Sequence, residues 1–111
     1  MERVIRRGDL VKVALSGDYG KPRPALVIQS DLFAEHPSIT LCLLTTSLQD
    51  APLMRLLVEP SSENGLQQRS QIQIDKIVTI PRPKALGPIG HLDDSVMLEV
   101  NRTLALWLGM A

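Results

Sequence analysis

The hydrophobic residues of this chain occur in short blocks separated by turn-forming residues, a pattern typical of β proteins. Five blocks rich in β-branched and aliphatic residues predict strands over 9–15, 25–29, 39–45, 53–58 and 70–80. The last block alternates polar and apolar residues over its first half, and it is long enough for one bent strand or two short ones. We therefore expect five or six short strands before residue 81.

One helix is expected near the C-terminus, at about 94–108. Four apolar residues recur there at helical spacing and predict one buried face: Met97, Val100, Leu104 and Leu108. Asp93 or Asp94 is suited to cap the first turn, and Gly109 is suited to end the helix. A further helical turn is expected at 31–35. Short strands followed by a terminal helix predict a mainly β fold, in which a compact, curled antiparallel sheet packs against the helix.

The length of 111 residues supports a single domain over 1–111, without internal repeat, low-complexity tract or linker. Hydrophobic residues make up 44% and charged residues 22% of the chain, the balance of a soluble globular protein. No apolar run approaches the roughly 20 residues that span a membrane, and the N-terminus lacks the apolar segment of a secretory signal. The one cysteine, Cys42, lies in an apolar stretch, which predicts a core residue in a reducing cytoplasm.

The net charge is zero, which argues against indiscriminate binding to polyanions, but the charge is unevenly distributed. Residues 1–30 carry six basic and three acidic groups, a local charge of +3, so the remaining residues carry −3. A locally basic segment suits a short nucleic-acid site, and it is equally common on an ordinary solvated surface. The charge distribution leaves both interpretations open.

Several kinds of site are absent from the sequence. His36 and His91 are isolated and Cys42 has no partner at zinc-binding spacing, so we expect no metal site. The chain has no phosphate-binding or dinucleotide-binding glycine loop and no Gly-x-Ser-x-Gly motif, and we expect no cofactor. The adjacent carboxylates at 93–94 fit a helix cap better than a catalytic pair.

The strongest chemical candidate is Arg23, which lies between Pro22 and Pro24 just before a buried strand. Proline fixes its own φ and favours extended backbone in the residue before it, so Arg23 is held where a loop becomes a strand. A permanently charged guanidinium with five donors is well suited to a phosphate. The structural alternative is a solvated arginine in an ordinary proline-rich turn.

Further polar groups lie at or near strand ends. Three hydroxyl-bearing residues close the 39–45 strand: Thr45, Thr46 and Ser47. Hydroxyl groups in such a position either bind a ligand or satisfy nearby backbone groups. Asp75 interrupts an alternating strand, where it either serves a function or forms a salt bridge with Lys76 or Arg82.

Five short segments of the chain follow the order and spacing of a known family. They are Gly-Asp-Leu-Val at 8–11, the Lys-Pro-Arg-Pro strand at 21–30, Leu-Leu-Thr-Thr-Ser at 43–47, the block at 65–77, and the helix with its flanks at 89–109. Each segment is short, but five in this order are hard to obtain by chance. On these residues the chain resembles the MazF/PemK toxins of bacterial toxin–antitoxin modules over nearly its whole length.

The resemblance implies a small SH3-like barrel of the CcdB/MazF kind, a homodimer, and metal-independent, sequence-specific cleavage of single-stranded RNA. It also implies inhibition by a cognate antitoxin whose disordered C-terminal tail occupies the RNA groove. By matching position, Arg23 and Thr45 are the expected catalytic pair, and Asp75 aligns with an acid that has a catalytic part in the PemK branch. The expected substrate-binding residues are Tyr19, Lys21, Thr46 and Ser47.

The chemistry of RNA makes these roles plausible. When the 2′-hydroxyl attacks the neighbouring phosphorus, a protein must activate that hydroxyl, offset the charge on the phosphorane and protonate the leaving 5′-oxygen. Arg23 is suited to clamp the phosphorane, and Thr45 to donate to the same oxygens. Asp75 or water is left as the acceptor of the 2′ proton.

One segment departs from the family pattern. The loop at 16–21 is shorter than the family's usual first loop, which covers the active site and helps hold substrate. The sequence therefore leaves both the RNA preference and the rate open. Tyr19 in this loop is suited either to stack on an unpaired base or to anchor the loop.

Two interpretations compete with a nuclease. A CcdB-like toxin shares the fold and binds DNA gyrase through its C-terminal end without cleaving nucleic acid, and Trp107 suits that role. The simpler explanation of Trp107 is a helix residue in the core or at a dimer interface. An SH3-like module for proline-rich ligands needs a groove lined with aromatic residues, for which one Tyr, one Trp and one Phe are too few. The pair of Arg23 and Thr45 favours the nuclease.

Overall fold

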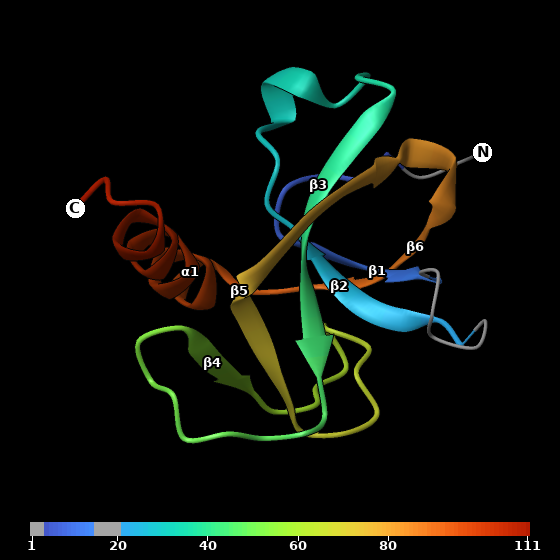
Figure 1. The fold of residues 1–111 in the computed structure, drawn as a ribbon. Coiled ribbons are helices and arrows are strands. Elements are labelled where there is room, and N and C mark those ends of the chain that lie inside the picture. Colours follow the sequence, from blue (N-terminus) through green and yellow to red (C-terminus); the bar gives the residue numbers. More distant parts are fainter. Residues whose placement is uncertain (1–3, 15–20) are drawn as a thin grey trace.

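The computed structural model describes residues 4–14 and 21–111, which form a curled antiparallel sheet and a C-terminal helix (Figure 1). The six strands of the sheet have the order β4-β5-β3-β2-β1-β6. They are β1 (Asp9–Val13), β2 (Arg23–Val27), β3 (Ser38–Thr45), β4 (Arg55–Val58), β5 (Ser70–Pro81) and β6 (Ala85–His91). The described residues also form the helix α1 (Asp94–Trp107) and the 3-10 turns η1 (Asp31–Phe33) and η2 (Arg82–Lys84). The expected mainly β fold with a terminal helix is confirmed.

The central strands are buried on both faces, because the sheet curls around itself and α1 covers one side. Leu10 and Leu26 belong to a core cluster that includes Val100 and other residues of α1. Their neighbours Val11 and Ala25 belong to a second cluster on the opposite face. Successive side chains of a strand point to opposite faces, so burial of both explains why the apolar run at 25–28 shows no alternation.

The strand β6 was not expected from the sequence. It contains Gly87, Pro88 and Gly90, which are poor strand formers by local preference. It nevertheless pairs with β1 from Asp9 to Val13, with a shift of register between Leu10 and Lys12. Proline is tolerated there because β6 lies at one end of the strand order, where one side of the strand needs no pairing partner.

The helix α1 has the predicted caps and, except at Leu108, the predicted buried face. The Asp93 carboxylate accepts a hydrogen bond from the Val96 N–H at 3.0 Å, and Gly109 follows the helix with a φ of +74°. Val100 and Leu104 are buried as expected, and Met97 packs against the same cluster. Leu108 was expected on this face but lies beyond the last helical turn and is 56% exposed. The prediction for Leu108 was therefore wrong.

The sequence allowed one bent strand or two short ones at 70–80. The structure has one long, bent strand, β5. Cys42 on β3 faces Ile77, whereas Leu44 on the same strand faces Ile72. The stretch of β5 between Ile72 and Ile77 is therefore longer than the stretch of β3 that it pairs with, so β5 contains a bulge. A bulge of this kind bends a strand and increases its twist. The bend allows the first half of β5 to pair with both β3 and β4.

Cys42 lies in the core, as its apolar neighbours predict. Its side chain is fully buried, and burial raises the pKa of the thiol to about 12. The thiol therefore stays protonated near neutral pH and is a packing residue rather than a nucleophile.

Among the described residues, no helix is long and apolar enough to cross a lipid bilayer.

The loop between β4 and β5 is held against β6 by one buried amide and one glycine. The side chain of Asn64 accepts from the N–H groups of Ser61 and Leu66 and donates to the carbonyl of Glu59, at 2.9 to 3.0 Å. Gly90 of β6 packs so closely on the backbone of Asn64 that a Cβ atom at Gly90 would overlap it. This contact helps to place the loop that leads to Gln68 and Ser70, which border the site described below.

Candidate active site

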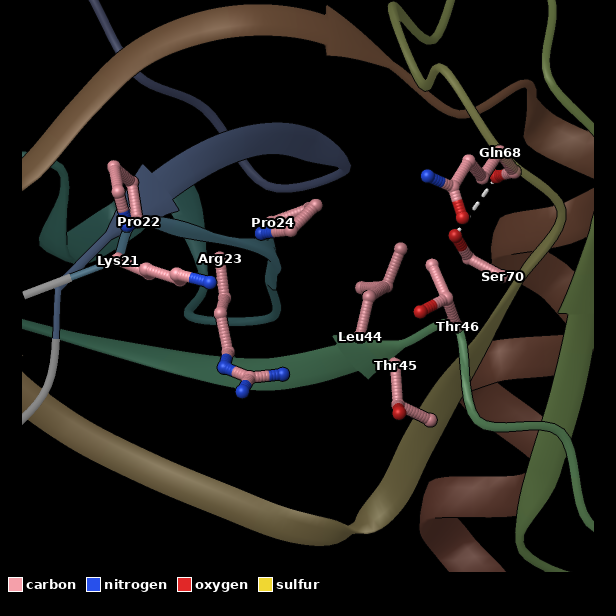
Figure 2. A pocket seen from close by; sticks show the side chains of 9 residues that line it. All are labelled: Lys21, Pro22, Arg23, Pro24, Leu44, Thr45, Thr46, Gln68 and Ser70. Carbon is pink, nitrogen blue, oxygen red and sulfur yellow. Dashed lines mark hydrogen bonds between the residues drawn. The ribbon is translucent and has the colours of Figure 1, made fainter. Parts of the chain in front are cut away.

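A hollow of about 420 Å³ lies where the start of β2 meets the end of β3 (Figure 2). It is bordered by Lys21, Pro22, Arg23, Pro24, Leu44, Thr45, Thr46, Gln68 and Ser70. Basic groups come from the start of β2, hydroxyl groups from the end of β3, and polar groups from the segment that leads into β5. A cation, several hydroxyl donors and an apolar floor form a suitable surface for a phosphate and its attached groups.

Strand register brings Arg23 and Thr45 together. Ala25 of β2 pairs with Leu43 of β3, so Arg23 and Thr45 lie two residues farther toward the same end of the two antiparallel strands. Residues two apart share a face, and Figure 2 shows both side chains on the same side of the sheet. Two residues that are distant in sequence thus border the same hollow.

The Thr45 hydroxyl has a fixed orientation. Its oxygen accepts a hydrogen bond from the backbone N–H of Ser47 at 3.1 Å. A hydroxyl that accepts in this way keeps its own hydrogen for donation to another group. Thr45 borders the hollow.

Only some of the predicted substrate-binding residues border the hollow. Lys21 and Thr46 border the hollow and are exposed. Ser47 is exposed but does not border it, and its backbone N–H holds the hydroxyl of Thr45 instead. Tyr19 lies outside the described residues.

Asp75 lies in the bent part of β5 and forms a salt bridge with Arg55 of β4. The Arg55 guanidinium donates to both carboxylate oxygens, at 3.0 and 3.3 Å, and the two side chains are 9% and 14% exposed. The sequence left open a functional role or a salt bridge with Lys76 or Arg82; a salt bridge forms, but its partner is Arg55, because β4 lies alongside β5. Asp75 is not among the residues that border the hollow.

Burial and the Arg55 pairing act on Asp75 in opposite directions. Burial tends to raise the pKa of Asp75, but the hydrogen bonds from Arg55 and from backbone, with the charges of Arg55 and Lys76, bring that pKa below its ordinary value. Asp75 is therefore ionised at neutral pH, with its lone pairs engaged by Arg55. Such a carboxylate is a weak proton acceptor.

Gln68 and Ser70 border the hollow and were not singled out from the sequence. The Ser70 hydroxyl donates to the carbonyl of Gln68 at 2.9 Å, which is the hydrogen bond drawn in Figure 2. A second hollow of about 270 Å³ shares this segment and adds Lys12 and Gln67 to the border. The polar run at 67–70, just before an alternating strand, was the signal available in the sequence.

The described residues contain no group of three or more histidine, cysteine, aspartate or glutamate side chains that could hold a metal ion. The charges at the hollow come from lysine and arginine, which bind anions rather than cations.

The sequence matches the family model of PemK-like, MazF-like toxins of type II toxin–antitoxin systems over residues 6–108. The chain belongs to this family. Its relatives include the probable endoribonuclease MazF of Mycolicibacterium smegmatis, which is 43% identical over 96% of this chain and 99% of the relative. Another is the endoribonuclease EndoA of Bacillus subtilis, 30% identical over 96% of this chain and 97% of the relative.

Solved structures share the fold of this MazF-like toxin. An endoribonuclease in complex with its cognate antitoxin, from a mycobacterial species, superposes with a TM-score of 0.81 at 20% identity, over 96% of this chain and 97% of that chain. A MazE–MazF complex from Deinococcus radiodurans superposes with a TM-score of 0.78 at 23% identity, over 99% and 100% of the two chains. The family that the sequence motifs suggested is thus confirmed.

Proposed function

We propose that this MazF-like toxin is a sequence-specific endoribonuclease that cleaves single-stranded RNA, including mRNA, without a metal ion, and thereby inhibits translation and growth. The observation that carries the proposal is the pair of Arg23 and Thr45, which the pairing of β2 with β3 brings side by side at a hollow that Lys21 also borders. The names of the relatives, endoribonuclease MazF and endoribonuclease EndoA, support the same activity.

The proposed reaction is attack of the 2′-hydroxyl on the adjacent phosphorus, which forms a 2′,3′-cyclic phosphate and releases the 5′-oxygen. Arg23 binds the non-bridging oxygens, where negative charge develops in the transition state. Thr45 donates its hydroxyl hydrogen to the same oxygens, since its oxygen already accepts from the Ser47 N–H. Arg23 acts through its charge rather than as a base, because the pKa of an arginine side chain is about 12.5 or higher.

The 2′ proton passes to water rather than to Asp75 in this proposal, and the leaving 5′-oxygen takes a proton from water. Asp75 is paired with Arg55, has a lowered pKa and does not border the hollow. Its alternative role as the catalytic proton acceptor is tested with the stability experiment on Asp75 in the Discussion.

The proposed partners are a cognate antitoxin, whose disordered C-terminal tail occupies the RNA groove, and a second copy of this chain in a homodimer. The solved structures of an endoribonuclease with its cognate antitoxin and of a MazE–MazF complex support an antitoxin partner. We further propose that the protein acts in the cytoplasm, where its RNA substrate is found.

The decisive experiment is incubation of purified protein with mixed-sequence RNA in excess EDTA. We expect discrete cuts that leave 2′,3′-cyclic phosphate ends. Arg23→Ala should lower the cleavage rate by about 10²–10³, the usual effect of removing one transition-state donor. Lys84→Ala is the control, because Lys84 is an exposed cation in η2 and does not border the hollow.

Two outcomes would contradict the proposal. If wild-type protein makes no cuts at high concentration, the nuclease function is wrong, and binding to DNA gyrase becomes the function to test. If Arg23→Ala cleaves as fast as Lys84→Ala, the protein is a nuclease but Arg23 is not at its centre. Circular dichroism of each variant separates loss of activity from loss of fold.

A further inference from the structure

Gln71 is a buried amide beside the active-site hollow, and the proposed reaction does not use it. Its side chain is 8% exposed and lies on β5, one residue beyond Ser70. Both ends of the amide bind the same residue: the Gln49 N–H donates to Oε1 at 3.0 Å, and Nε2 donates to the Gln49 carbonyl at 2.8 Å. The Gln71 amide thus makes with the backbone of Gln49 the two hydrogen bonds that a neighbouring strand would otherwise make.

The segment held in this way is the loop at 46–50, which directly follows Thr45. All five of its residues are exposed, so side-chain packing contributes little to its position. Ser47 in this loop supplies the N–H that orients the Thr45 hydroxyl. A shift of the loop would therefore change the direction in which Thr45 donates.

Gln71 also helps to set the position of the Thr45 backbone. In the pairing of β3 with β5, Gln71 is the backbone partner of Thr45 itself. One residue thus holds the strand position that carries Thr45 and, through its side chain, the loop that orients the Thr45 hydroxyl. An error of about 1 Å in the position of a catalytic group is enough to lower a rate by about 10².

We propose that Gln71 is a positioning residue for RNA cleavage, which it supports by clamping the 46–50 loop so that the Ser47 N–H holds the Thr45 hydroxyl toward the scissile phosphate. This inference rests on the proposed nuclease function. It assigns to Gln71 no contact with RNA.

The Gln71→Met variant separates this role from a contribution to stability. Methionine keeps the length and approximate volume of glutamine but removes both hydrogen-bonding atoms. A buried amide is costly unless bonded, so its replacement by an apolar group of similar shape is close to neutral when the former partners can bond to water. Gln49 is exposed, and water can reach its N–H and carbonyl.

Gln29 provides a matched control at the other end of β3. Its amide also binds backbone groups: Oε1 accepts from the Thr40 N–H at 2.9 Å, and Nε2 donates to the carbonyls of Ser38 and Phe33 at 3.1 and 3.0 Å. Gln29 does not border the active-site hollow. Gln29→Met therefore removes an equivalent clamp from the same strand without touching the loop at 46–50.

The experiment measures kcat, KM and the affinity for an RNA analogue with a 2′-deoxy group at the cleaved position. For Gln71→Met we expect kcat to fall about tenfold, less than the ~10²–10³ of a whole donor, while KM and analogue affinity change less than about twofold. Gln29→Met should leave all three unchanged. Amide hydrogen exchange at Gln49 should become faster in Gln71→Met and stay slow in Gln29→Met.

A double-mutant cycle with Thr45→Val tests whether Gln71 acts on kcat through the Thr45 hydroxyl. Valine keeps the shape of threonine and lacks that hydroxyl. We expect Gln71→Met to cause little further loss in the Thr45→Val background, because the group it positions is gone. Additive losses would overturn the proposal, as would equal losses of kcat in the Gln71 and Gln29 variants. Absence of cleavage by wild-type protein would overturn the proposed function instead, and the exchange rate at Gln49 would still decide whether the clamp exists.

Discussion

Arg23 and Asp75 are charged residues of the same sheet, but their surroundings differ. Arg23 begins β2 between two prolines and borders a hollow together with Lys21. Asp75 lies in the bend of β5, where β4 supplies Arg55 as its partner. A guanidinium that borders a hollow suits substrate binding, whereas a carboxylate whose oxygens are engaged by a neighbour suits a structural role.

The Asp75–Arg55 pair predicts an acid-sensitive contribution to stability. The folded-state pKa of Asp75 is lowered, so its contribution is fully present above the unfolded-state pKa of about 3.9 and is lost as the pH falls through the folded-state pKa. Asp75→Asn should therefore lower the free energy of unfolding at pH 7 by about 3 kcal/mol, the lower end for breaking a buried pair. The difference from wild type should shrink below about pH 4. Urea unfolding at pH 7, 5 and 3.5 measures both effects.

Glu99→Gln is the control for this experiment, because Glu99 and Arg102 form an exposed pair, with side chains 60% and 66% accessible. Exposed pairs contribute little, so this variant should resemble wild type at each pH. A pH-independent difference for Asp75→Asn would show that its charge is not the source of the stability. If the folded Asp75→Asn protein loses RNA cleavage as completely as Arg23→Ala, Asp75 is catalytic and the assignment of the 2′ proton to water is wrong.

Among the elements, β6 and the loop at 59–65 depend on each other. The backbone of Glu63 accepts a hydrogen bond from the His91 N–H at 2.9 Å, beside the tight contact between Gly90 and Asn64. Ile89 is the one strong β-former of this strand, so its position depends on pairing with β1 and on this contact. The loop in turn leads to Gln68 and Ser70, which border the hollow.

Gly90→Ala should therefore destabilise the protein through crowding. Gly90 does not have a positive φ, so alanine suits its backbone, but the added Cβ would overlap the backbone of Asn64 and Glu63. We expect the free energy of unfolding to fall by about 1–3 kcal/mol, as for other overpacked sites. Thermal or urea unfolding measures this change.

Gly109→Ala separates crowding from backbone strain. Gly109 has a φ of +74°, and a Cβ there would meet no described atom within 4 Å. Its cost is conformational and should be about 1 kcal/mol, the usual preference for glycine at such a position. If Gly90→Ala is no more destabilising than Gly109→Ala, the contact between β6 and the loop is looser than the geometry indicates.

Across the whole molecule, the C-terminal end presents apolar side chains that the sheet does not cover. They are Leu98, Leu106, Trp107, Leu108 and Met110, each at least 48% exposed. Trp107 is therefore not a core residue, and of the two structural roles that the sequence allowed, a subunit contact is left. Such a surface fits the homodimer proposed from family membership.

Sedimentation equilibrium should accordingly give twice the chain mass of 12.2 kDa. Trp107→Glu should shift the protein toward monomer, because a charge is costly in an apolar interface. Phe33→Glu is the control: Phe33 is 55% exposed in η1, which Figure 1 shows away from α1. A wild-type monomer would contradict the proposed homodimer, and a dimeric Trp107→Glu protein would place the interface elsewhere.

Local sequence determined the features that depend on near neighbours. The apolar blocks specified five of the strands, Asp93 and Gly109 specified the ends of α1, and prolines on either side of Arg23 specified its place at the start of a strand. The apolar surroundings of Cys42 specified its burial. These predictions held because side-chain periodicity, capping and proline geometry act over a few residues.

Tertiary structure decided what depends on residues brought together from distant parts of the chain. Pairing with β1 made a strand of a glycine- and proline-containing segment, and the place of β4 beside β5 made Arg55 the partner of Asp75. The register of β2 and β3 set Arg23 opposite Thr45, and the register of β3 and β5 set Gln71 beside Thr45. Register follows from the packing of the whole sheet, so the sequence identified the chemical groups while the sheet determined which of them meet.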